Sequence, residues 1–455
     1  MKYLKSLSVI ISLVICILGN GIYAEAKNTN TVESYIAEFQ NKTNCKSVSV
    51  VIYDDGKKSY FGNKEQDDLY QIGSMTKAFT GLGIMKLIQE GKIIPDKKVS
   101  DYLPEFETYY EGKKADILVR DLLSQTSGFT NSEIDYPSAE ENMTLSQWVE
   151  SVSGKELKYK PGDQYSYSNV NYNLLGAIIE AVSGVSYKDY MEQEILIPLG
   201  LEHTFVGIPQ NEKSIVGGTR LGYGRVHDFE MPVKEGAIPA GYFYSNINDM
   251  CKWIEIWLGR ADIPPEYKEL IKKTKDNIKQ ENDYYAGWEF FGDDVIGHSG
   301  GTANYSSRIV YSTEKNVGVC VLTNVNVATS TDRLCNDILA ITTGKEPAGY
   351  VCDVWTVFDN VFSGVTILGI ILFFIISRIK NIKAMIVSDV VGVVILVSII
   401  VIMPVIFQAS WSSILFIWAP WSVLGGMIVL LMNVIALTIK IWMWKKNENN
   451  NKKSG

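Results

Sequence analysis

Three long apolar stretches lie in the C-terminal quarter of the chain. They cover roughly residues 355–376, 384–407 and 414–442 and follow a linker at residues 344–352. A helix of about 20 apolar residues spans the hydrocarbon core of a bilayer and satisfies its own backbone hydrogen bonds there. The pattern therefore predicts three transmembrane helices within residues 353–444, followed by a tail.

Basic residues around these stretches predict their orientation. The loop between the first two stretches and the tail at 445–455 are both basic, whereas residues 408–413 carry no basic residue. Because basic loops stay in the cytoplasm, we expect the loop and the tail there and residues 27–352 outside the membrane. The basic residues are Arg378, Lys380 and Lys383 in the loop, and Lys445, Lys446, Lys452 and Lys453 in the tail.

Two carboxylates lie near or within the apolar stretches, Asp359 and Asp389. A charge inside a bilayer is costly and usually has a partner. We expect Asp359 at the membrane interface and Asp389 against a neighbouring helix, with a catalytic role for neither.

The first 26 residues have the pattern of an export signal. Lys2 and Lys5 precede an apolar run at residues 7–18, and Ala24-Glu25-Ala26 supplies a small-x-small cleavage site. A signal peptide at residues 1–26 agrees with an external domain. Two alternatives are an uncleaved anchor and a lipoprotein modified at Cys16, although the preceding Ile15 is larger than a lipobox requires.

Alternation around β-branched residues predicts a strand at the start of the exported region, and the turn Glu314-Lys315-Asn316 predicts a matching pair of strands near its other end. Helical spacing predicts helices between the two ends. The turn signal Asp54-Asp55-Gly56 joins the first two strands into a hairpin. This order predicts a mixed α/β domain over residues 27–343. The strands are expected at residues 47–53, 59–62, 307–311 and 317–323, and the helices at residues 77–89 and 172–182.

Composition narrows the classes of partner. The net charge is −8, with no basic block outside the chain ends, so we do not expect a nucleic-acid partner. Five cysteines follow the signal peptide, at spacings that do not suit a metal. We expect buried thiols with at most one or two bridges. These cysteines are Cys45, Cys251, Cys320, Cys335 and Cys352.

The first candidate motif, Ser74-Met75-Thr76-Lys77, opens the first predicted helix directly after Gly73. One helical turn places the hydroxyl and the amine on the same face. A lysine made neutral by burial can accept the serine proton, and the helix N-terminus can stabilise an oxyanion.

Two further motifs lie downstream. In Tyr167-Ser168-Asn169, the phenol can relay a proton to the leaving group, and the carboxamide can hold both the lysine and a substrate carbonyl. In the stretch from His298 to Gly301, the imidazole can orient the substrate. The backbone N–H after Gly300 can complete an oxyanion hole with that of Ser74.

Each motif is weak when taken alone. The Ser-x-x-Lys spacing recurs at residues 312–315 and 377–380, and a second Tyr-x-Asn begins at Tyr244. An isolated match is usually a solvated helix face or an ordinary loop, His298 can be a structural histidine, and Gly300-Gly301 can be a strand bend. The serine hydrolase interpretation depends on the motifs occurring together.

In this order, the three motifs resemble the signatures of class C β-lactamase-related serine hydrolases. That group includes penicillin-binding proteins, DD-peptidases and several esterases, and a sister set of motifs marks the class A enzymes. The likeness extends to residues 119–128 and 239–241 and covers about residues 32–343. It implies an antiparallel sheet flanked by helices plus an all-helical subdomain, with the active site between them.

The resemblance also implies residue roles and one restriction. His298 stands where true β-lactamases have a lysine, which argues against β-lactam hydrolysis as the main activity. Gln125 stands where many relatives have a histidine, and we draw no conclusion from it. By family roles, the nucleophile is Ser74, the general base Lys77 and the proton relay Tyr167, with Asn169 and His298 positioning the substrate.

The apolar tail suggests a substrate class. A domain of this family followed by three helices looks like the prodrug-activating peptidases of nonribosomal-peptide pathways, the colibactin-maturing type, which remove an N-acyl-D-amino-acid cap after export. We therefore expect a membrane-anchored serine hydrolase that acts on an extracytoplasmic D-amino-acid amide or ester. No metal or organic cofactor is implied.

Two alternatives remain open. One is a cell-wall D-alanyl carboxypeptidase or esterase, including an enzyme that acts on D-alanyl esters of teichoic acid. The other, of a different class, is a non-catalytic penicillin-binding receptor, although the tail at residues 445–455 offers little cytoplasmic chain with which to signal.

Overall fold

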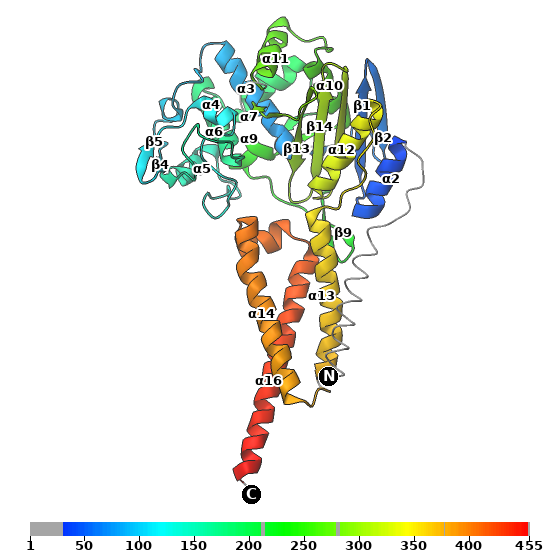
Figure 1. The fold of residues 1–455 in the computed structure, drawn as a ribbon. Helices are drawn as coiled ribbons and strands as arrows, with labels where there is room; N and C mark the ends of the chain where they lie inside the picture. The colour runs from blue at the N-terminus through cyan, green and yellow to red at the C-terminus, as the bar shows by residue number, and fades with distance from the viewer. Residues whose placement is uncertain (1–30, 211–213, 279–282, 377, 454–455) are drawn as a thin grey trace.

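The computed structural model describes residues 31–453 apart from residues 211–213, 279–282 and 377. The predicted signal peptide, residues 1–26, lies outside the described residues. The fold is shown in Figure 1.

A seven-stranded antiparallel sheet forms the centre of the domain. Its strand order is β11-β12-β13-β14-β15-β1-β2, so the two predicted hairpins meet where β1 pairs with β15 and Val50 lies opposite Val321. Both hairpins are confirmed. The strands are β1 (Val48–Asp54), β2 (Lys57–Gly62), β11 (Tyr284–Tyr285), β12 (Trp288–Phe290), β13 (Val295–Gly301), β14 (Ser306–Ser312) and β15 (Val317–Thr323).

Alternation along β1 directs its side chains into two separate cores. Val50 and Ile52 pack with α2 and α12 on one face, whereas Val51 and Tyr53 face the larger core that contains α3 and α10. This period of two is the reason the strand was predictable. The helices that pack around the sheet are α2 (Val32–Thr43), α3 (Thr76–Gln89), α10 (Ile247–Leu258), α11 (Pro265–Ile278) and α12 (Ala328–Thr342).

A second, mainly helical part lies beside the sheet and supplies the other side of the site (Figure 1). The helix predicted at residues 172–182 is α6 (Asn169–Ser183), which ends at Gly184 in the left-handed conformation. This part is not purely helical, because it also contains the small sheet β5-β4-β6. Its other elements are α4 (Val119–Leu123), α5 (Leu145–Val152), α7 (Tyr187–Met191), α8 (Ile197–Leu199), α9 (Ile238–Gly241), β4 (Thr108–Tyr110), β5 (Lys113–Ala115) and β6 (Lys155–Glu156).

Short elements connect the two parts. A three-stranded sheet has the order β3-β10-β7, and β8 pairs with β9 as a hairpin. The β8–β9 hairpin extends toward the C-terminal helices (Figure 1). The bounds are β3 (Tyr70–Gln71), β7 (Phe205–Val206), β8 (Thr219–Gly222), β9 (Arg225–Asp228) and β10 (Phe243–Ser245).

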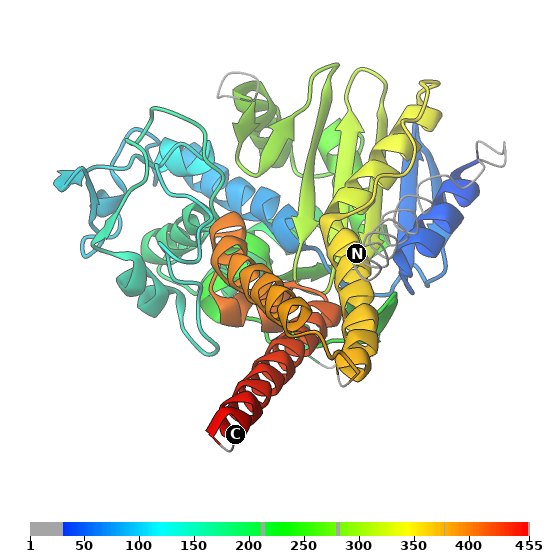
Figure 2. The same cartoon turned by 60° about the horizontal axis from the view of Figure 1, so that its bottom comes forward.

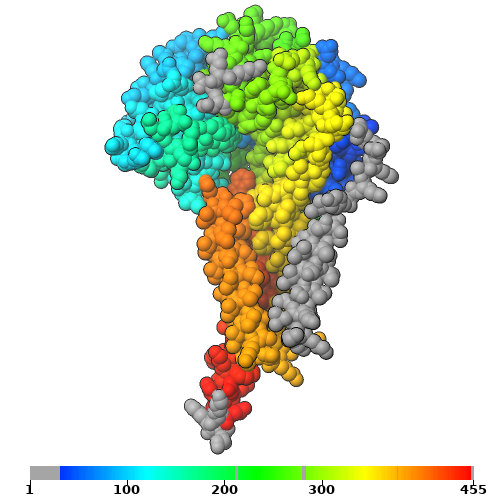
Figure 3. Space-filling view, in the orientation of Figure 1, coloured from blue at the N-terminus to red at the C-terminus, as the bar shows by residue number. Residues whose placement is uncertain are grey.

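Three helices in the C-terminal region are long and apolar enough to cross a membrane. They are α13 (Val354–Ile376), α14 (Ile382–Phe407) and α16 (Trp421–Lys453). Figure 3 shows them projecting from one side of the domain, and in the turned view of Figure 2 they come forward in front of it. Asp389 of α14 accepts hydrogen bonds from Thr438 of α16, so its predicted neighbouring helix is α16.

The predicted start of the third stretch, residue 414, is wrong. The long helix begins at Trp421, and residues 411–418 form the short α15 (Trp411–Ser413) and a π-helical turn, η6 (Ile414–Trp418). Pro420 explains the break, because proline favours an extended conformation of the preceding residue. Ala419 has this conformation, with φ −77° and ψ 152°. We call residues 408–420 the connector.

Two buried charged side chains, Arg220 and Asp359, form hydrogen bonds between the C-terminal region and the domain. Arg220 of β8, only 2% exposed, donates to the carbonyl oxygens of Leu415, Phe416 and Ala419 in the connector. Asp359 of α13 accepts hydrogen bonds from the backbone N–H groups at the tip of the β8–β9 hairpin, at 2.8 and 2.7 Å. The expected interfacial carboxylate therefore lies at the junction between α13 and the domain.

The five described cysteines are free thiols. Four are buried, and Cys352 is exposed. Within the described part of the chain they form no disulfide, so the four buried cysteines stabilise the fold by packing rather than by cross-linking.

Candidate active site

Ser74 lies in a tight turn, η2 (Gly73–Met75), that runs directly into α3. Gly73 has φ +52°, and a Cβ there would lie 2.5 Å from the backbone nitrogen of Gly301. Glycine is therefore required both by the left-handed backbone and by the close approach of β13. The turn brings Ser74 next to the third motif.

Lys77 is completely buried one turn after Ser74. Its Nζ donates to Ser74 Oγ at 2.9 Å, to Asn169 Oδ1 at 2.8 Å and to the carbonyl oxygen of Ala240 at 2.6 Å. Asn169 Oδ1 and the Ala240 carbonyl oxygen can only accept hydrogen bonds, so the neutral form of the amine donates its two N–H groups to them and directs its lone pair at Ser74 Oγ. Burial lowers the pKa of Lys77 well below its usual value, which favours the neutral amine that a general base needs.

Tyr167 lies beside this pair. Lys77 Nζ is 5.0 Å from the centre of its ring. Burial raises the pKa of the phenol, and its hydrogen bond with Ser74 acts in the opposite direction. The opposite pKa shifts of Lys77 and Tyr167 indicate a neutral amine next to a protonated phenol, so the amine is the stronger candidate for the base.

Gln125 organises the loop that carries Tyr167 and Asn169. It adopts φ +59° and is fully buried. Its side-chain oxygen accepts from the backbone N–H of Ser168 at 2.9 Å, and its carbonyl oxygen accepts from that of Ser166 at 2.8 Å. Both bonds flank Tyr167, so Gln125 fixes the backbone position of the phenol.

His298 lies behind Tyr167 rather than at the surface of the pocket. Its ring centre is 6.2 Å from that of Tyr167. Nδ1 is 2.6 Å from the carbonyl oxygen of Ser299, which makes Nδ1 the donor and leaves Nε2 to accept from the Tyr284 hydroxyl at 3.2 Å. Burial is the main cause that lowers the pKa of His298 to about 3, and the positive charge of protonated Lys77 is the second. The ring is therefore neutral.

Gly300 and Gly301 bring the end of β13 against the nucleophile turn. The pairing with β12 stops at Gly297, which leaves this edge facing η2. A Cβ on Gly300 would lie 2.1 Å from the carbonyl oxygen of Ile72. The glycines therefore permit the backbone approach on which the predicted oxyanion hole depends.

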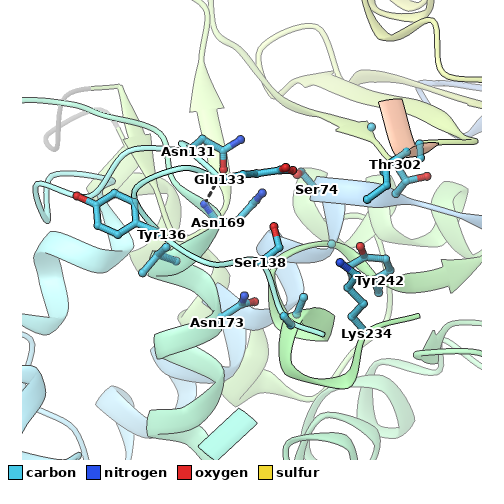
Figure 4. Close-up of a pocket in the computed structure, with 18 of the residues that line it drawn as sticks. Ser74, Asn131, Glu133, Tyr136, Ser138, Asn169, Asn173, Lys234, Tyr242 and Thr302 are labelled. Carbon is cyan, nitrogen blue, oxygen red and sulfur yellow. Dashed lines mark hydrogen bonds between the residues drawn. The ribbon is translucent and has the colours of Figure 1, made fainter. Parts of the chain in front are cut away.

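A cavity of about 240 Å³ opens in front of Ser74. Tyr167, Asn169 and Gly301 line it, whereas Lys77, His298 and Gly300 lie behind the lining. Figure 4 shows the labelled polar side chains around this opening, which come from both parts of the domain. Among the residues that the structure describes, no cluster of His, Cys, Asp or Glu could hold a metal ion.

The connector contributes to the same cavity. Ile417 and Trp418 are part of its wall. Trp418 Nε1 donates to Glu133 Oε1 at 3.1 Å, and the backbone N–H of Glu133 donates to the carbonyl oxygen of Gln408 at 2.9 Å. The region of apolar helices is therefore a structural component of the pocket.

Several of these residues carry little or no signal in the sequence. The Ala240 carbonyl could have been suspected only from the short stretch at residues 239–241, and Gln125 only from its position before Thr126-Ser127-Gly128. Glu133 and Trp418 carry no local signal, because 285 positions separate them.

Comparison with protein families and sequences gives an independent result. The beta-lactamase family model matches residues 32–343. "Protein flp" of Staphylococcus aureus (strain MW2) is 34% identical over 267 residues, which cover 56% of this chain and 53% of that protein. A "putative D-alanyl-D-alanine carboxypeptidase" of Escherichia coli (strain K12) is 30% identical over 269 residues, 51% of this chain and 61% of that protein. The chain thus spans a little over half the length of these relatives.

Solved structures show the same architecture. The octameric penicillin-binding protein homologue from Pyrococcus abyssi aligns with a TM-score of 0.59 and 27% identity, covering 73% of this chain and 80% of that one. A class C beta-lactamase in complex with cefoxitin aligns with a TM-score of 0.59 and 19% identity, covering 69% of this chain and 98% of that one. The second likeness concerns the fold alone.

Proposed function

The chain belongs to the beta-lactamase family and is a serine hydrolase, and from this premise we propose that it cleaves an amide or ester of a D-amino acid through an acyl-enzyme on Ser74. The observation that carries the proposal is the contact between the buried Lys77 amine and Ser74 Oγ at 2.9 Å. A buried, neutral amine at this distance can activate a serine.

In the proposed mechanism, Ser74 Oγ attacks the substrate carbonyl carbon and its proton passes to Lys77. The backbone N–H groups of Ser74 and Gly301 stabilise the oxyanion. Tyr167 passes the proton to the leaving group as the bond to the acyl carbon breaks. Water then attacks the acyl carbon and gives one proton to Lys77. That proton passes to Ser74 Oγ as the ester bond to the serine breaks, and the acid is released.

Asn169 and His298 have different parts in this scheme. Asn169 holds Lys77 at 2.8 Å and lines the cavity, so it positions both the base and the substrate. His298 acts through the backbone of β13 and through the Tyr284 hydroxyl, 3.2 Å away. Its role is to position the strand edge where substrate binds.

We also propose that the domain lies outside the cytoplasmic membrane. The three apolar helices would span the bilayer, with the basic loop and tail inside, and the predicted signal peptide would export the domain. A reporter fused after Lys446 tests this topology, because a cytoplasmic reporter should be active only if that end is inside. An external signal would overturn the orientation.

Two substrate classes fit this mechanism. One is an exported prodrug with an N-acyl-D-amino-acid cap, which the domain followed by three apolar helices suggests by architecture. The other is a D-alanyl peptide or ester of the cell wall, favoured by the similarity to the Escherichia coli protein named as a putative D-alanyl-D-alanine carboxypeptidase.

Incubation of the purified full-length protein with three substrates tests the proposed function. The substrates are an N-acyl-D-asparaginyl peptide, a D-alanyl-D-alanine peptide and a D-alanine ester, with products measured by liquid chromatography and mass spectrometry. Release of product from at least one, and none from its L-counterpart, is expected. Stable acylation by penicillin without turnover of any of the three would instead support the non-catalytic receptor.

A further inference from the structure

A fixed carboxylate stands in the cavity that contains the nucleophile. Glu133 and Ser74 both line this cavity. The Trp418 indole holds Glu133 Oε1 at 3.1 Å, and the connector holds its backbone through Gln408. Oε2 has no hydrogen-bond partner within the described ranges, so one carboxylate oxygen remains for a ligand.

Aromatic side chains line the cavity that contains this carboxylate. Their faces carry partial negative charge and attract cations, most strongly when the cation is partly desolvated. Burial, and after it the negative charge of Glu133, raises the pKa of the Tyr242 phenol to about 12. The electric field of Glu133 therefore reaches that phenol. A cavity with a carboxylate and several rings suits a cationic group. The aromatic residues that line it are Tyr136, Trp148, Tyr167, Tyr242 and Trp418.

Lys234 also lines the cavity and carries a positive charge, but it forms no ion pair with Glu133 within the described residues. Figure 4 shows Glu133 on the side of Asn131 and Asn169, and Lys234 on the side of Tyr242. No ion pair within 4.0 Å joins Lys234 to Glu133 in the described structure. The carboxylate is therefore available to a substrate cation.

We propose that Glu133, held by Trp418, binds the free α-ammonium group of the substrate, which makes the substrate a D-aminoacyl ester or amide with an unacylated amine. This inference rests on the proposed hydrolase function and narrows it. A charge-assisted hydrogen bond to Oε2 recognises the protonated amine, whereas an N-acyl group has no charge and is larger. The connector thus contributes directly to substrate selection.

The test compares D-alanine methyl ester with N-acetyl-D-alanine methyl ester, using the full-length protein at a pH below 7. The wild-type protein should hydrolyse the free amine with the higher kcat/KM. Glu133→Gln should lower kcat/KM for the free amine by at least about tenfold, mainly through KM, the effect expected for one lost hydrogen bond between charged groups. The N-acetyl ester should change less than about threefold, because it makes no ionic contact with Glu133.

Two further variants control for stability and for net charge. Trp418→Phe keeps an aromatic side chain but removes the indole N–H, and it should lower kcat/KM more for the free amine than for the N-acetyl ester. Asp135→Asn makes the same charge change at an exposed position outside the cavity lining, and it should leave the preference unchanged. Raising the pH above about 8, where an α-amine loses its proton, should weaken the wild-type preference.

Equal losses on both esters in Glu133→Gln, or a wild-type preference for the N-acetyl ester, would overturn the ammonium site. Labelling of the protein by a fluorophosphonate monitors the serine hydrolase function separately. Normal labelling without amine preference would reject only the ammonium site, whereas loss of labelling in the wild-type protein would reject the proposed catalytic serine.

Discussion

Arg220 of β8 donates a hydrogen bond of 2.6 Å from Nε to the carbonyl oxygen of Ala419, the residue before Pro420. Its guanidinium also lies 4.2 Å from the Trp421 ring at the start of α16. Burial lowers the pKa of Arg220 to about 10, so the group keeps its charge at neutral pH. One side chain therefore connects the domain to the connector that lines the pocket.

Arg220→Met should loosen this connection. The carbonyl oxygens of the connector lose a charged donor, and such bonds contribute about 2 kcal/mol each when buried. We expect a lower midpoint of thermal unfolding in detergent and a higher KM with a smaller change in kcat, because Ile417 and Trp418 belong to the wall. Arg225→Met, at an exposed position of the same hairpin, is the control. Equal effects of both variants would contradict the docking role.

Lys77→Met should lower kcat/KM by about 10²-fold or more, because it removes the proposed general base while retaining much of the side-chain volume. Hydrolysis of an ester measures the effect, and circular dichroism checks the fold. Lys86→Met provides a matched control in the same helix, since its amine pairs with Glu90 and Glu194 away from the cavity. Near-normal activity of Lys77→Met would assign the base to another group.

Tyr167→Phe should also cost about 10²-fold in kcat/KM, because the phenol is the proposed proton relay. The effect should be larger for an amide than for an ester with a good leaving group, which needs less protonation. Comparing the two substrates measures this difference. Tyr165→Phe, two residues earlier and 44% exposed, is the control and should have little effect. If Tyr167→Phe lowered kcat/KM equally for the amide and the ester, the result would argue against a relay.

Acidification should destabilise the protein through His298. Its folded-state pKa of about 3 lies below the usual 6.5, so between these values the unfolded chain binds a proton that the folded chain does not. Stability is therefore lost as pH falls below about 6.5, by about 2 kcal/mol at pH 5. Thermal unfolding followed from pH 7 to 5 should show a steeper loss for the wild type than for His298→Asn. His203→Asn, at an exposed histidine, should retain the wild-type slope.

Local periodicity and motif order made much of the fold predictable. The β1–β2 hairpin follows from alternation and the turn signal at residues 54–56, and the β14–β15 hairpin from the turn at residues 314–316. Helix α6 follows from its apolar spacing and Gly184. The position of Ser74 and Lys77 on one face follows from helix geometry, and their 2.9 Å contact agrees with it.

The remaining features depend on contacts between distant segments. The wall formed by Glu133 and Trp418 has no counterpart in any local pattern, and the Ala240 carbonyl that holds Lys77 is a backbone atom with no sequence signal. The third apolar stretch was predicted to begin too early, because the apolar composition continues through Pro420 whereas the helical backbone does not.

The most direct test of the account is fluorophosphonate labelling of the full-length protein and two serine variants. We predict labelling of the wild type and of Ser312→Ala, which removes the serine of a second Ser-x-x-Lys sequence, and no labelling of Ser74→Ala with its fold intact. Persistent labelling of Ser74→Ala, or an unlabelled wild type, would contradict the assignment of Ser74 as the nucleophile.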